Sequence, residues 1–441
     1  MTAPIEPQPS PETLAATDDA APPRGALGVL FLIVLADLIG FGIIIPLLPF
    51  YALRFDASPL QVALLFSAYS AVQLVAGPIL GAVSDRVGRR PVLIVSQLGS
   101  VVGFVLLGLA TVSDRIGPTF GLTLVYLSRI IDGFSGGNIT AAQAYVSDVT
   151  TPATRSRGMG VIGAAFGIGF AIGPAVGGLL AHRFGHSMPG FVAAGFCLLA
   201  AILTAAMLKE SRAPKPSNSR MWLHPSSFAP VVRRPVTAQL LGIWFLSMTA
   251  FVMLQAIFAL FLADRYGYGE AAVGWFFAYV GLIIAVVQGG LIGRLTKRVG
   301  EWPLAAWGPF AVALSMGVYV WAGFAPAVWM LVIAGFFNAA GRSLQGPSVQ
   351  SLLSQDNPPH EQGAAFGLFQ ALGSLASTIG PFIGGLLYAK ASPARMAAPF
   401  ALAGVMMLVA GAWTALLSAS ASRRRADVST PTTTATPVAE V

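Results

Sequence analysis

The chain has 441 residues, of which 55% are hydrophobic and 10% are charged. Soluble domains carry about 25% charged residues, so this composition excludes an ordinary water-facing surface and indicates a protein that lies in lipid. The net charge is +8, which can reflect either a nucleic-acid partner or the topology of a membrane protein. The positions of the basic residues along the chain distinguish the two. The single cysteine, Cys197, excludes an internal disulfide.

Apolar segments long enough to cross a bilayer recur from Ala26 onward with short interruptions. The first six are predicted at 26–53, 60–82, 91–112, 120–147, 157–181 and 189–208. The second six are predicted at 236–263, 271–293, 302–323, 327–354, 362–389 and 396–418. The sequence therefore predicts an all-α membrane protein with twelve transmembrane helices in two six-helix halves.

Polar segments separate these groups and flank them. Residues 1–25 hold six prolines and four acidic residues, which is typical of a disordered tail and not of a signal peptide. We expect a disordered cytosolic tail, an N-terminal half, a cytosolic linker, a C-terminal half and a second disordered cytosolic tail. Their predicted ranges are 1–25, 26–208, 209–235, 236–419 and 420–441.

The basic residues are unevenly distributed between the two sides of this arrangement. If both ends are cytosolic, eighteen of the 26 Lys and Arg residues fall on the cytosolic side, and six fall on the other. Such a bias sets the orientation of a membrane protein. The basic charge is thus a feature of topology and does not predict a nucleic-acid partner. We expect a multi-pass protein of the inner (cytoplasmic) membrane, monomeric in the lipid bilayer.

The two halves repeat each other. GPILGAVSDRVGRRP (77–91) aligns with GGLIGRLTKRVGEWP (289–303), and AIGPAVGGLL (171–180) aligns with TIGPFIGGLL (378–387). Matching motifs at matching places indicate two parallel repeats about an axis normal to the membrane. In such proteins small-molecule substrates bind near the midplane between the repeats.

The chain has no GxxxxGK[ST] motif and no Gly-Lys dipeptide at all, so an ATP-binding P-loop is absent. Metal-ligand spacings of His and Cys are also absent. We expect no metal and no cofactor. Transport would then be driven by an ion or solute gradient, or it would be facilitated diffusion.

Charges inside predicted helices are costly and therefore informative. Asp37 lies deep in the first helix, where it is either a proton carrier or a structural hydrogen-bond acceptor. Arg129 and Asp132 share one face of the fourth helix, either for proton coupling or as a fixed ion pair. Arg342 is the corresponding cation of the second half and either contacts substrate or caps carbonyls.

Uncharged polar residues within the spans are candidates for the wall of a cavity, although each alone is more often an interhelical hydrogen bond. With Arg342, the candidate cavity residues are Asn138, Gln143, Gln255, Asn338 and Gln345.

Two further motifs suggest moving parts. The short turn after the second helix is a candidate cytosolic gate or a lipid anchor, formed by Asp85, Arg86, Gly88, Arg89 and Arg90. The fifth helix is rich in small residues that let helices touch and slide. Its candidate hinge consists of Gly163, Gly167, Gly169, Gly173, Pro174 and Gly177.

An enzymatic alternative comes from GFSGG (133–137), which fits the G-x-S-G pattern of intramembrane serine proteases. A nucleophilic serine needs a base, and all four histidines are expected in loops, so we predict that the chain is not an enzyme.

The twelve-helix pattern with GAVSDRVGRRP after the second helix resembles the major facilitator superfamily. RIIDG in the fourth helix and GIGFAIGPAVGG in the fifth resemble motifs of its drug:proton antiporters. LADLIGFGIIIPLLPFY and FLADRYGY resemble the tetracycline-efflux branch.

This resemblance implies proton-coupled efflux of small hydrophobic or amphipathic compounds such as tetracycline-like drugs, driven by the proton gradient. It places proton coupling at Asp37 and Arg129, the gate at Asp85 and Arg86, and the hinge at Gly173–Pro174. The alternatives are proton-coupled uptake of a sugar or organic acid on the same fold, and a scaffold or receptor that transports nothing. The second half lacks the buried acid that tetracycline exporters usually have, which weighs against tetracycline itself.

Overall fold

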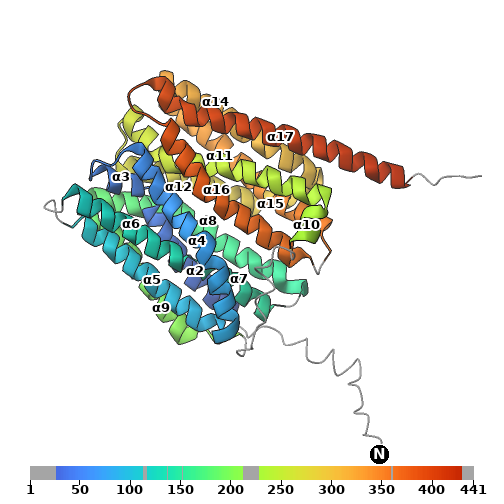
Figure 1. Ribbon diagram of the computed structural model, residues 1–441, viewed down its shortest axis with the longest axis horizontal. Helices are drawn as coiled ribbons and strands as arrows, with labels where there is room; N and C mark the ends of the chain where they lie inside the picture. Colours follow the sequence, from blue (N-terminus) through green and yellow to red (C-terminus); the bar gives the residue numbers. More distant parts are fainter. Residues whose placement is uncertain are drawn as a thin grey trace, which may run out of the picture.

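The computed structural model describes residues 26–112, 117–136, 138–150, 152–211, 228–358 and 361–429. The predicted N-terminal tail and most of the predicted linker lie outside these residues. Every regular element in the described part of the chain is a helix (Figure 1). The helices of the first half are α2 (Ala26–Ile44), α3 (Leu48–Leu53), α4 (Pro59–Val87), α5 (Arg89–Ala110), α6 (Pro118–Ser135), α7 (Asn138–Val149), α8 (Pro152–Phe184) and α9 (Ser187–Met207).

The second half repeats this order. Its elements are α10 (Ala229–Arg233), α11 (Pro235–Tyr266), α12 (Glu270–Val286), a π-helix η3 (Val287–Leu291), α13 (Ile292–Val299), α14 (Glu301–Phe324), α15 (Val328–Asp356), α16 (Gln362–Leu387) and α17 (Pro393–Ser429). In Figure 1 the helices run side by side, with α10 and the end of α17 on the right. We call that side the linker end and the other side, where α3 lies, the opposite end.

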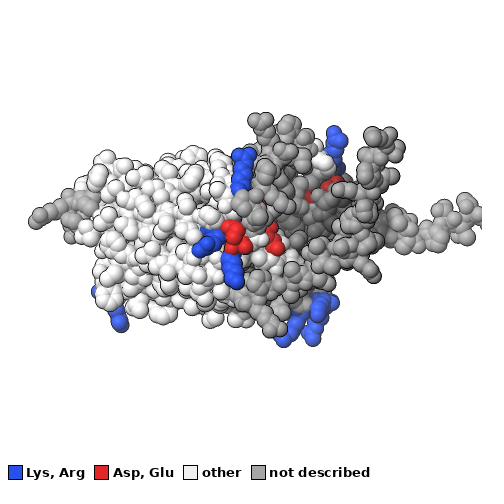
Figure 2. Space-filling view, turned by 90° about the horizontal axis from the view of Figure 1, so that it is seen from below, with Lys and Arg blue, Asp and Glu red and all other residues white. Residues whose placement is uncertain are grey.

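Ten helices in the described residues are long and apolar enough to cross a membrane. The remaining two predicted spans correspond to α6 with α7, and to α15. Figure 2 shows one face of the molecule. Its surface is almost free of charged side chains toward the opposite end, as expected for spans in lipid. Acidic and basic side chains gather toward the linker end. The all-α membrane fold with twelve spans is confirmed.

Two predicted spans are interrupted, whereas a third, 271–293, continues without a break from α12 through the π-helix η3 into α13. The first is interrupted between Ile44 and Leu48, because Pro46 has no N–H group to continue the helical hydrogen bonds. The fourth is divided into α6 and α7 next to Gly136, in a glycine-rich segment of low helix propensity.

The last helix also differs from its prediction, because α17 continues to Ser429, beyond the expected boundary at 419. The rest of the predicted C-terminal tail, 430–441, lies outside the described residues. His182, which was expected in a loop, lies in the last turn of α8.

The repeat seen in the sequence is also a repeat of the backbone. Gly88 ends α4 with φ of 103°, and its counterpart Gly300 ends α13 with φ of 87°. These positive angles favour glycine, which explains why both copies of the motif keep RVG at this place.

Buried hydrophobic residues form one shared core and two separate ones. The shared core includes Ile43 and Phe104 of the first half and Met253 and Tyr319 of the second. A second cluster lies within the first half around Tyr145, and a third lies within the second half around residues 349–353. The halves are therefore fused through a common core over only part of their length.

Helix α8 lies between α2 of its own half and α12 of the other. A Cβ atom added at Gly173 would lie 2.7 Å from the carbonyl carbon of Gly42, and one at Gly281 would lie 2.7 Å from the Cα of Ala171. Only glycine permits backbones to approach this closely.

We expect Gly173→Ala to destabilise the protein by about 1–3 kcal/mol, because the added methyl group forces α2 away from α8. Gly163→Ala is the matched control, since nothing lies within 4 Å of a Cβ added there. Thermal unfolding in detergent checks this pair. An equal loss of melting temperature in both variants contradicts the packing argument.

Candidate binding cavity between the two halves

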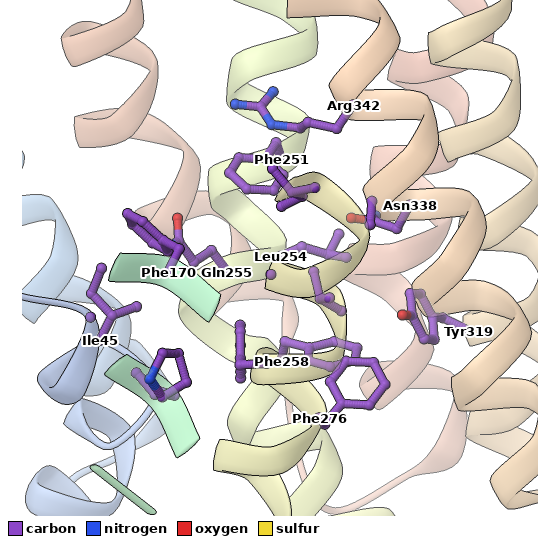
Figure 3. Close-up of a pocket in the computed structure, with 18 residues that line it drawn as sticks. Ile45, Phe170, Phe251, Leu254, Gln255, Phe258, Phe276, Tyr319, Asn338 and Arg342 are labelled. Carbon is purple, nitrogen blue, oxygen red and sulfur yellow. The ribbon is translucent and has the colours of Figure 1, made fainter. Parts of the chain in front are cut away.

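A cavity lies between the halves, with about 800 Å³ of empty space that includes its open mouth. The first half contributes residues from α2, α8 and the break after α2, and the second contributes residues from α11, α12, α14 and α15 (Figure 3). The wall is mostly hydrocarbon and aromatic, and its lining residues include Ile45, Phe170, Phe251, Leu254, Phe258, Phe276 and Phe277.

The polar groups of this wall come from the second half. The structure brings together three of the predicted cavity residues, Gln255, Asn338 and Arg342. Neither amide has a hydrogen-bond partner among the described residues, so both are available to a ligand. Tyr319 also lines the cavity and was not predicted, because an isolated aromatic residue within an apolar helix gives no sign of the surface it faces.

The other predicted cavity residues are placed elsewhere. Gln345 is 1% exposed and donates a hydrogen bond of 2.6 Å to the Ser247 hydroxyl, so it links α15 to α11. Gln143 is exposed on α7 and is not part of the cavity lining. The backbone of Asn138 begins α7, and its side chain lies outside the described residues.

Arg129 and Asp132 form an ion pair inside the first half. Arg129 Nη1 lies 3.2 Å from Asp132 Oδ2, and both side chains are at most 4% exposed. Asp132 also accepts a hydrogen bond of 2.9 Å from the Ser100 hydroxyl on α5. Arg129 Nη2 is buried without a hydrogen-bond partner in the described structure. The pair therefore faces α5 and is not part of the cavity lining.

We expect Asp132→Asn to lower the free energy of unfolding by about 3–5 kcal/mol, since it leaves the Arg129 charge buried and unpaired. A double variant, Arg129→Met with Asp132→Leu, should recover most of that stability. Thermal unfolding of the three proteins measures the effect, and transport by the double variant then separates a structural pair from a proton-coupling one. A double variant no more stable than the single one contradicts this account.

Asp37 is partly buried on α2 and faces α9. The Cys197 thiol lies 3.6 Å from Asp37 Oδ1 and is oriented to donate to it. Cys197 is thus more than a packing residue. Gly40 on the same helix allows the approach, because a Cβ added there would lie 3.0 Å from the carbonyl oxygen of Ala193. Helix α2 also supplies Gly42 to the cavity wall, so one helix connects the Asp37 carboxylate with the cavity.

The predicted hinge residues of α8 lie along its contacts with α2 and α12. Added Cβ atoms at Gly169, Gly173 and Gly177 would meet the backbone of α2. Pro174 lines the cavity, and its carbonyl oxygen faces Gly274 of α12. A Cβ atom added at Gly167 would lie 3.8 Å from Ala285 of α12, which is an ordinary contact. One added at Gly163 would have no described atom within 4 Å. The gap between the halves therefore widens along α8 toward the linker end.

Arg89 and Arg90, two of the predicted gate residues at the linker end, bind to groups of their own half. Arg89 pairs with Asp85 at 2.6 Å and with Asp148 at 3.1 Å. The backbone amides of Arg89 and Arg90 donate to the two carboxylate oxygens of Glu210. Gly88 is required beside them, because a side chain there would collide with that carboxylate. Arg86 also has an interaction partner. The hydrogen bonds and ion pairs of Arg89 and Arg90 connect α4, α5, α7 and the end of α9.

At the opposite end a polar contact bridges the halves. His186 directly precedes α9, and its Nδ1 lies 3.3 Å from Glu270 Oε1 at the start of α12. Both residues line a small pocket together with Leu47, Phe50 and Tyr51 of the first half. This end is therefore closed by side chains from both halves.

We expect Glu270→Gln to open this end more often, because the carboxylate that faces His186 Nδ1 becomes a neutral amide. An exposed pair of this kind is worth up to about 1 kcal/mol, so access should rise by up to about fivefold. Maleimide labelling of Phe50→Cys in a Cys197→Ala background measures it. Glu301→Gln is the control, since among the described residues the hydrogen bonds of Glu301 are with Ser351 and Gln355 of its own half. Unchanged labelling in Glu270→Gln contradicts a closing role.

The described residues contain no group of three or more His, Cys, Asp or Glu side chains that could hold a metal ion. Two six-helix repeats with a cavity between them are the architecture of a membrane transporter. The family model of the Major Facilitator Superfamily matches residues 30–328 and 310–439. The chain belongs to the major facilitator superfamily.

Among curated relatives, the chain is 31% identical over 374 residues to the class C tetracycline resistance protein of Escherichia coli, covering 84% of this chain and 91% of the relative. It is 29% identical over 391 residues to multidrug resistance protein 2 of Bacillus subtilis (strain 168), covering 86% and 93%.

Solved structures show the same fold. A bacterial homologue of the human lysosomal transporter Spinster, inward-facing and unoccupied, aligns with a TM-score of 0.71 at 15% identity, covering 91% of this chain and 98% of that one. The human organic anion transporter TETRAN aligns with a TM-score of 0.66 at 23% identity, covering 89% and 99%.

Proposed function

We propose that the protein is a secondary active transporter that exports small hydrophobic or amphipathic compounds, such as tetracycline-like drugs, in exchange for protons. The observation that carries this proposal is the cavity between the halves, with a largely aromatic and aliphatic wall and a few polar groups. Such a wall binds apolar molecules and orients them through a small number of hydrogen bonds. The relatives named for tetracycline and multidrug resistance support the same substrate class.

We place the linker end, with both tails, in the cytosol of a cell whose cytoplasmic membrane holds the protein. The bias of basic residues supports this orientation. The cavity then takes substrate from the cytosol or the inner leaflet, while His186 and Glu270 close the external side.

Proton coupling is assigned to Asp37, with Arg129 and Asp132 as a second buried charged group. Asp37 lies on α2, the helix that also borders the cavity at Gly42 and packs against α8 through glycine. A change in the charge of Asp37 would alter its bond to Cys197 and thereby the position of α2. Small shifts of a tightly packed helix are converted into discrete rearrangements of its neighbours.

The gate and hinge follow from the same arrangement. For outward opening, α8 would slide against α12 along the glycine contact, and the linker ends of the two halves would approach. The turn around Arg89 would then meet the second half, and its ion pairs with Asp85 and Asp148 keep it rigid for that contact.

Proton-coupled uptake of a sugar or organic acid is the second candidate. Sugars need many hydrogen-bonding groups, and the described cavity wall offers the side chains of Gln255, Tyr319, Asn338 and Arg342. This balance favours an amphipathic compound over a sugar.

We expect Asp37→Asn to abolish proton movement that runs opposite to drug flux in proteoliposomes, because the variant cannot release a proton. Proton flux is measured with a pH-sensitive dye inside the vesicles after addition of tetracycline or other amphipathic drugs. Glu301→Gln removes a carboxylate of α14 that bonds to Ser351 and Gln355 of α15, and it should exchange normally. Proton flux in the same direction as substrate, or full exchange in Asp37→Asn, would falsify the antiport proposal.

A further inference from the structure

Among the residues that the structure describes, the wall of the cavity carries a positive charge and no negative one. Arg342 is the charged member of this described lining, which contains no Asp or Glu. The remaining polar groups, Gln255, Asn338 and Tyr319, are neutral hydrogen-bonding groups. A site with this balance favours anions and disfavours cations, because like charges repel strongly where water is excluded.

The guanidinium of Arg342 is held by neutral partners. Its central carbon lies 3.6 Å from the centroid of the Phe251 ring and 5.7 Å from that of Trp244. Its Nη2 donates to the Met248 sulfur at 3.0 Å. Ring faces and a thioether fix the plane of the guanidinium without neutralising it. Its hydrogen-bonding capacity is far from used, since an arginine carries five N–H donors.

Three other arginines of the chain are arranged differently. Arg89, Arg129 and Arg234 each form an ion pair with a carboxylate of the protein, at distances between 2.6 and 3.2 Å. Arg342 forms none with the described residues. The chain neutralises these three arginines with its own carboxylates, whereas Arg265 and Arg294 donate to backbone carbonyls. Arg342 has neither kind of oxygen partner among the described residues and lies on the cavity wall.

The polar and apolar parts of the wall are separated along the cavity. Figure 3 shows Arg342 beside Phe251 at one side, Asn338 and Gln255 at intermediate positions, and Phe258 with Phe276 at the other side. Phe258 and Phe276 are part of an aromatic group, with ring centroids 5.1 Å apart. A ligand with an anionic group at one end and a flat apolar body at the other matches this order.

We propose that the preferred substrates are amphipathic organic anions, with the anionic group bound by Arg342 and an aromatic body against Phe258 and Phe276. This inference rests on the proposed export function and specifies its substrate. A carboxylate fits the planar fork of the guanidinium, which binds it through two parallel hydrogen bonds. The anionic head of the substrate then lies toward the linker end. Arg342 is in the middle of α15, whereas Phe276 is near the start of α12, at the opposite end.

The test uses three probes with one naphthalene body, namely naphthylacetate, its neutral amide and a naphthylmethyl-trimethylammonium ion. Transport is measured in proteoliposomes under an imposed pH gradient, with internal pH recorded at the same time. Binding to the purified protein is measured separately, by the shift of its melting temperature. We expect wild type to favour the anion over the cation by about tenfold or more, as one charge-assisted hydrogen bond can provide.

Arg342→Gln should lose that preference in both binding and transport, because the anion loses a charge-assisted hydrogen bond and the amide loses only a neutral one. Arg342→Lys keeps the charge and should keep part of the preference, which also shows that substitution at this position leaves the fold intact. Arg298→Gln removes the same charge from an exposed site on α13 and should match wild type.

Transport of the cation in preference to the anion, or an anion preference that survives in Arg342→Gln, overturns this inference. In either case proton exchange with the amide or the cation would still support the proposed export function. Absence of proton-coupled movement with all three probes overturns both.

Discussion

Close contacts between helix backbones, which glycine residues make possible, hold the two halves together. In α8, Gly173 and Gly177 pack on α2 of their own half, and Gly178 meets Glu270 of the other half. In α16 the corresponding glycines repeat this division, since Gly385 meets the start of α4 across the interface. In lipid, packing of this kind replaces the hydrophobic effect between helices. The shared core, the cavity and the position of α2 depend on these contacts.

Polar groups are arranged around that frame in separate places. Asp37 and the Arg129–Asp132 pair lie within the first half, whereas the polar wall of the cavity is provided by the second. Under the proposed function, a substrate and a proton would not share a side chain. Communication between them would run through α2 and α8, which touch through glycine and both border the cavity. Two halves with the same fold would then contribute differently to transport.

The sequence predicts the spans, the internal repeat and the glycine contacts well, because each depends on length, composition or spacing along one chain. It fails where the direction of a side chain decides. Gln345 and Asn338 look equivalent in an apolar helix, yet one bonds to Ser247 and the other lines the cavity. A helix that is apolar on all sides gives no periodicity from which to read its inner face. The interruption at Pro46 was missed because proline is common within membrane helices.

The matching use of three glycines in each half has an evolutionary consequence. Gly178 contacts the beginning of α12, and Gly385 contacts the beginning of α4, which is the counterpart of α12 in the repeat. A single six-helix unit with this pattern would hold both sides of the contact, and two copies could pair about a twofold axis with the same surface used twice. Gene duplication and fusion would then join a dimer that already had its interface. After fusion each copy could change alone, which allowed a carboxylate to remain in one half and an unneutralised arginine in the other.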